Sequence, residues 1–154
     1  MQSFHDKLNQ YRFEFLLGAL LLVLFNKAFF LDASFYTTYV WPINMVILGL
    51  TSFGIFKERE LWVRWIKNIL FLFSVLIPLL FKYLFINSLL VEVSFLIYIA
   101  WYTFIFIEVM RQIFQRSEAT VSVIFGSISG FLLLIVITQF VLLQLEYNFP
   151  GSFN

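Results

Sequence analysis

Five long apolar runs, separated only by short polar stretches, occupy nearly the whole chain and restrict what it can fold into. A run of about 18 or more apolar residues is long enough to cross the ~30 Å hydrocarbon core of a bilayer as a helix. Helices of a soluble domain carry one apolar stripe, whereas these runs are apolar on all sides. The sequence therefore predicts an all-α, polytopic membrane bundle with five transmembrane helices. The runs are Phe13–Phe30, Phe35–Phe56, Trp65–Ile86, Leu89–Met110 and Ala119–Leu145.

The composition agrees with a multi-pass protein of the cell (inner) membrane, with the lipid bilayer as its main partner. Hydrophobic residues make up 62% of the chain and charged residues 12%, against about 25% charged residues in soluble domains. The absence of cysteine excludes disulfides and thiolate ligands. The net charge of +1 says little about partners, and the lack of a basic patch argues against nucleic acid.

The distribution of basic residues predicts how the chain threads the membrane. With five spans, eight basic residues fall on one side and two on the other. Positive residues collect on the cytoplasmic side, so the N-terminus is expected inside and the C-terminus outside. The eight are Lys7, Arg12, Lys57, Arg59, Arg64, Lys67, Arg111 and Arg116, and the two are Lys27 and Lys82.

Three parts follow from this pattern: residues 1–12 as a cytoplasmic tail, 13–112 as a four-helix membrane bundle, and 113–154 around a long fifth helix. The tail suits either an amphipathic surface helix or a frayed end. The second span is expected to kink near Pro42.

The fifth helix is expected from Ser117 to Tyr147, 31 residues or roughly 46 Å, with Ser117 as N-cap and Glu118 in the first turn. The four tryptophans are expected mostly at the membrane interfaces.

Candidates for catalytic chemistry are few, so no enzyme activity, cofactor or metal site is expected. The one histidine, His5, lies in the N-terminal tail. No metalloprotease, nucleophile-elbow or phosphate-loop motif occurs in the sequence.

Three polar side chains within the spans are the candidates for an intramembrane role: Glu92, Glu108 and Gln139. Glu92 falls in the first turns of its helix, where the helix dipole favours an acid. Glu108 precedes Arg111 by three residues, the spacing of a helical ion pair. Gln139 lies near mid-span and is expected to face another helix or water, because an amide against lipid is unfavourable.

Small residues in the fifth run form a GxxxG stretch, which allows two helix backbones to approach closely. The contact could lie inside the bundle or between subunits. The expected helix-packing residues are Gly126, Ser127, Ser129 and Gly130.

The stretch from Val123 to Leu134, VIFGSISGFLLL, and the later Phe149–Phe153, FPGSF, resemble bacterial potassium channels. In that family a similar helix is the outer pore helix, followed by a pore helix and a TxGYG filter. The resemblance covers about 30 residues, and Ile135 stands where the family often has glycine. The sequence ends at Asn154, before any filter, and selectivity requires the backbone carbonyls of a filter.

The leading hypothesis is therefore a potassium-channel-like membrane protein, truncated or reduced, without its own pore. It would act as a homo-oligomer or with a channel-like partner subunit. The alternative is a non-conducting interaction or accessory subunit. A small transporter is the least favoured reading, because no repeat pair is evident.

Overall fold

The computed structural model describes residues 11–30, 35–56, 59–83, 88–115 and 120–151. The regular elements in these ranges are all helical, which confirms the all-α prediction, and each apolar run contains one α-helix. The predicted tail lies outside the described residues apart from positions 11 and 12. The elements are α2 (Arg12–Phe25), the 3-10 turn η1 (Asn26–Phe29), the π-helical turn η2 (Tyr36–Val40), α4 (Trp41–Ile55), α5 (Leu61–Tyr83), α6 (Ser88–Phe114) and α7 (Val121–Asn148).

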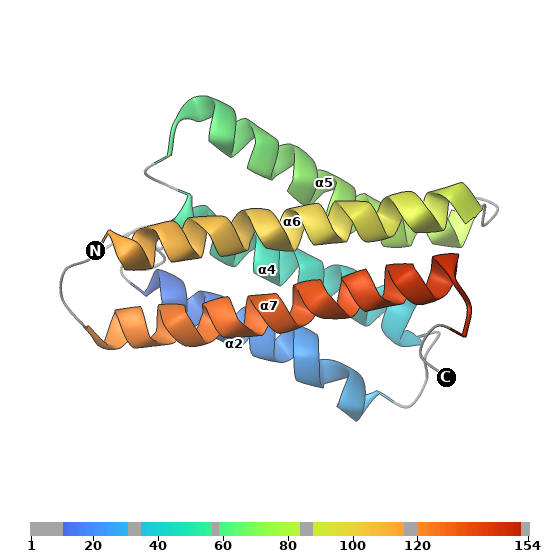
Figure 1. The fold of residues 1–154 in the computed structure, drawn as a ribbon, viewed down its shortest axis with the longest axis horizontal. Coiled ribbons are helices and arrows are strands. Elements are labelled where there is room, and N and C mark those ends of the chain that lie inside the picture. Colours follow the sequence, from blue (N-terminus) through green and yellow to red (C-terminus); the bar gives the residue numbers. More distant parts are fainter. Residues whose placement is uncertain (1–10, 31–34, 57–58, 84–87, 116–119, 152–154) are drawn as a thin grey trace.

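Consecutive α-helices run in opposite directions along the long axis of the molecule (Figure 1). Neighbouring helices pack together in the order α2, α4, α5, α6, α7 and back to α2, so the five form a closed ring, across which α4 also contacts α6. The contact between α6 and α7 is the most extensive, and α7 also packs along α2. The fifth helix is therefore an integral part of the bundle.

The first turns of α5 lean away from the other helices (Figure 1). Leu61, Trp62 and Trp65 are exposed there, whereas Val63 on the opposite face is buried. The last turns of α4 and α6 and the first turns of α2, α5 and α7 all lie at this end of the bundle. Five described basic residues belong to it (Arg12, Arg59, Arg64, Lys67 and Arg111), while Lys27 and Lys82 belong to segments at the other end.

Large apolar side chains from all five helices fill the interior. Trp101 is completely buried, beside the ring of Phe71, so this tryptophan belongs to the core of the bundle. Trp62 and Trp65 are exposed. The principal core residues are Leu16, Leu20, Met45, Leu48, Trp101, Tyr102, Ile105, Leu133, Val136 and Phe140.

Pro42 lies in the first turn of α4, directly after the π-helical turn η2. Proline has no N–H to donate, and its ring crowds the carbonyl four residues earlier. The chain relieves this crowding by widening the preceding turn, so that the N–H of Trp41 donates to the carbonyl of Tyr36, five residues back. The segment stays helical through η2 and α4, as the extension of this span before Pro42 predicted.

The ends of α7 differ from the predicted ends by a few residues. Thr120 is extended, and its hydroxyl accepts a hydrogen bond from the Val123 N–H, so Thr120 is the N-cap. The predicted cap Ser117 and its neighbour Glu118 lie outside the described residues. At the other end the helix stops at Asn148, ahead of Pro150 and of Gly151, whose φ is +86°.

Two helices among the described residues are long and apolar enough to cross a membrane by length and composition: Leu90–Phe114 within α6, and α7. The prediction that all five helices meet this standard is not supported. The α-helical part of α2 has 14 residues and that of α4 has 15, and α5 carries Arg64 and Lys67 in its first two turns.

Candidate functional site

The densest group of interacting charges surrounds Glu108, at the end of the bundle where α4 and α6 both finish. Its carboxylate is buried, with only 2% of the residue exposed. Arg111 Nη2 donates to Oε1 at 2.6 Å, and Gln112 Nε2 donates to the same oxygen at 2.8 Å. Arg59 Nε lies 3.1 Å from Oε2, as an ion pair and not as an aligned hydrogen bond.

Gln112 joins this cluster to the end of α4. Its amide Nε2 also donates to the backbone carbonyl of Ile55 at 2.5 Å. The last carbonyls of a helix have no partner within the helix, so this bond satisfies one of them. The cluster thus fixes the end of α4, and the Arg59 segment that follows it, onto α6.

The chemistry of the cluster fits a structural role, in which it joins α4 and the Arg59 segment to α6. One carboxylate meets two guanidinium groups and an amide donor, so its lone pairs are engaged by neighbouring residues. The predicted pair between Glu108 and Arg111 is present. Arg59 was missed because its approach depends on how α4 packs. The spacing of four residues between Glu108 and Gln112 was a usable helical signal.

A second buried charge, that of Lys67, was not singled out from the sequence. Its residue is 2% exposed, and its ammonium nitrogen lies 3.3 Å from the centroid of the Phe53 ring. The negative face of an aromatic ring attracts a cation, by about 2 kcal/mol when the pair is desolvated. Lys67 thereby holds α5 against α4 at the same end as the Glu108 cluster.

An aromatic group closes the interior toward the other end of the bundle. Tyr98 and Tyr102 both stack on the ring of Phe140, with centroids 5.2 and 5.6 Å away. Trp41 Nε1 donates to the Tyr98 hydroxyl at 3.2 Å, and that hydroxyl donates to the Ser74 carbonyl at 3.3 Å. These side chains fill the space between α4, α5, α6 and α7 with rings.

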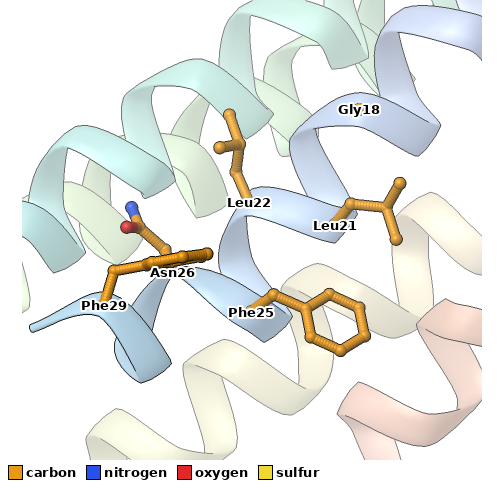
Figure 2. A pocket seen from close by; sticks show the side chains of 6 residues that line it. All are labelled: Gly18, Leu21, Leu22, Phe25, Asn26 and Phe29. Atoms are coloured by element: carbon orange, nitrogen blue, oxygen red, sulfur yellow. The ribbon is translucent and has the colours of Figure 1, made fainter.

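An open groove of about 320 Å³ runs along the outer side of α2 and η1. Figure 2 shows its apolar side chains with the single amide of Asn26 among them. This amide donates to Oδ1 of the buried Asn44 at 3.1 Å, so it is engaged by the bundle. The lining residues are Gly18, Leu21, Leu22, Phe25, Asn26 and Phe29.

Three of the four residues of α7 that were predicted to pack, Gly126, Ser129 and Gly130, are buried within this chain, and Ser127 is not. A Cβ at Gly130 would overlap the terminal methyl of Met110 on α6, and a Cβ at Gly126 would lie 3.3 Å from Ile113 on α6 and from Phe13 on α2. Ser129 is buried, and its hydroxyl donates to the Phe125 carbonyl. Ser127 is exposed and bonds the carbonyl of Val123.

The other two predicted polar residues point away from the bundle. Glu92 is exposed in the second turn of α6. Gln139 is exposed on α7, and no hydrogen bond joins its amide to another described residue. Of the two surroundings expected for Gln139, another helix or water, another helix of this chain is not found. The adjacent Phe140 occupies the inward position instead.

No family model, curated protein or solved structure shows significant similarity to this chain. These comparisons do not link the chain to potassium channels, so that resemblance stays a prediction from the sequence. Among the described residues, no group of three or more His, Cys, Asp or Glu side chains is placed to hold a metal ion.

Proposed function

We propose that the chain is a multi-pass integral membrane protein in which all five helical segments cross the bilayer. The outward surface carries the argument, because large apolar side chains point away from the bundle on every helix. Examples along the ring are Phe15, Leu50, Leu72, Leu96 and Phe131. A soluble bundle would present polar residues there, and exposed apolar patches of this kind mark a surface that meets lipid or another protein.

The lengths of the shorter segments are compatible with this proposal. From Arg12 to Phe29, α2 and η1 together make 18 residues, roughly 29 Å of helix. From Tyr36 to Ile55, η2 and α4 together make 20 residues, roughly 30 Å. Both values are close to the ~30 Å hydrocarbon core. The basic residues gathered at one end of the bundle support a cytoplasmic location for that end.

Within the membrane, we propose that the protein is the helical domain of a potassium-channel-like assembly, acting as a packed scaffold beside the conducting path. The resemblance of α7 to an outer pore helix supports the channel-like assignment. The stacked rings of Tyr98, Tyr102 and Phe140 support the scaffold role, because an interior filled by side chains offers ions no passage.

Reporter fusions test the membrane proposal. A reporter that is active only outside the cytoplasm, fused after Asn154, should be active, and the same reporter inserted beside Arg59 should be silent. A cytoplasmic reporter at the two positions should give the opposite result. Activity of one reporter at both positions would refute the five-span model, which has three helices, α5, α6 and α7, between Arg59 and Asn154.

A second candidate function is a non-conducting interaction subunit. It is favoured by the outward amide of Gln139, which a helix facing only lipid has no reason to carry. Recovery of a second membrane protein that conducts no ions, together with the purified chain, would favour this candidate. A channel scaffold instead requires the recovered partner to conduct ions.

A further inference from the structure

We propose that the outward face of α7 is a contact between two copies of this chain, centred on Gln139. This inference rests on the proposed membrane location. The face holds Ile128, Gln139 and Leu142, all exposed, with the half-buried Ile135 between them. Their spacing of seven, four and three residues forms one seam along the helix, the pattern of left-handed helix pairs.

Gln139 is the polar group of this seam that has no partner in the part of the chain that the structure describes. The neighbouring hydroxyls are satisfied within α7, since Thr138 donates to the Leu134 carbonyl at 2.8 Å and Ser127 donates to the Val123 carbonyl at 3.0 Å. The Gln139 amide has two donors and an acceptor and no hydrogen-bond partner among the described residues.

Depth in the membrane makes this unpaired amide significant. Gln139 lies nine residues before the end of α7 at Asn148, roughly 13 Å along the helix. A glutamine side chain is too short to reach the interface from there. In hydrocarbon an amide without a hydrogen bond is unfavourable by several kcal/mol, so a partner at the same depth is required.

A second copy supplies that partner directly. Two copies inserted with the same topology carry parallel α7 helices, which places Gln139 of one copy level with Gln139 of the other. The amide is self-complementary, because each side chain can donate to the carbonyl oxygen of its mate across a two-fold axis. The glycines Gly126 and Gly130 are already used against α6 and α2, which leaves this opposite face for the contact.

Cysteine crosslinking in native membranes tests the contact, since the chain has no cysteine of its own. Leu142→Cys, which keeps Gln139, should form an oxidised product of twice the 18.3 kDa chain mass. Leu72→Cys on the outer face of α5 is the matched control: Leu72 is 57% exposed against 43% for Leu142, yet it should give no such product.

Adding Gln139→Leu to Leu142→Cys should weaken dimerisation about tenfold, and Gln139→Asn should retain part of it. Equal crosslinking with Gln139→Leu, no crosslinking of Leu142→Cys, or crosslinking only to a different protein would each overturn the proposal. An alkaline wash of the same membranes separates the hypothesis of the α7 contact from the hypothesis of the membrane location. Chain that stays in the membrane without crosslinking counts against this contact alone, and chain that washes off counts against both.

Discussion

A single carboxylate, that of Glu108, holds together the ends of two helices that the whole of α5 separates in the chain. Its three partners come from α6 itself and from the segment after α4. Charged groups inside a protein are tolerated only where they are paired and hydrogen-bonded. The cluster therefore serves to position the end of α4 against α6, and its removal should loosen the end of α4.

Replacing Glu108 with alanine should destabilise the bundle by about 1–3 kcal/mol, because the buried amide of Gln112 loses an acceptor. The two arginines, about 30% exposed at their side chains, recover some hydration, which keeps the loss below that of a fully buried pair. Thermal unfolding in detergent micelles measures the effect. Glu92→Gln on the exposed face of the same helix is the control and should change stability by less than about 0.5 kcal/mol. Equal stability of the two variants would contradict a stabilising role of the Glu108 cluster.

At the scale of elements, two glycines show how closely the helices approach. Gly49 on α4 faces the ring of Phe71 on α5, and a Cβ there would overlap the ring. Gly18 on α2 has no atom within 4 Å of the position of its Cβ. The same substitution should therefore have opposite effects at the two sites.

Gly49→Ala should destabilise the protein by about 1–3 kcal/mol, since a rigid ring has to move. Gly18→Ala should stabilise it by about 0.4–1 kcal/mol, because alanine lowers the entropy of the unfolded chain and meets open space. The difference in unfolding temperature between the two variants is the measurement. A loss at Gly18 equal to that at Gly49 would mean that the groove along α2 is filled.

The packing of α7 on α6 gives a third prediction at this scale. Gly130→Leu and Gly126→Leu should each weaken the bundle by about 1–3 kcal/mol, the usual scale of overpacking, by pushing α7 away from Met110 and Ile113. The same two substitutions should have a smaller effect on the association of two chains through the Gln139 face than on thermal stability. Unchanged stability in both variants would show that the two glycines make no close contact.

For the whole molecule, the closed ring of helices around an aromatic interior predicts that the purified chain alone conducts no ions selectively. Reconstituted in planar bilayers, it should show no preference for K⁺ over Na⁺. A potassium-selective channel reconstituted in the same lipids serves as the positive control. A reproducible selective current would require a path through or beside the rings of Tyr98, Tyr102 and Phe140, and would overturn the scaffold role.

Several features of the fold could be predicted from local patterns. The five helical segments follow from the length of the apolar runs, and Pro42 predicts a distortion of the helix near the start of α4. The ion pair of Glu108 with Arg111 follows from their spacing along one helix. The contribution of Arg59 was not predictable, because it comes from a segment whose place depends on the packing of α4.

The sequence by itself determined how many helices form and, to within a few residues, where they lie, because apolar run length and chain-breaking residues are properties of neighbours along the chain. Only the tertiary structure decided which face of each helix turns inward. A helix that is apolar on all sides has no stripe to orient it, so Trp101 in the core, Gln139 on the surface and Gly126 against α6 could not be assigned in advance. Those choices depend on which side chains fit together across the ring.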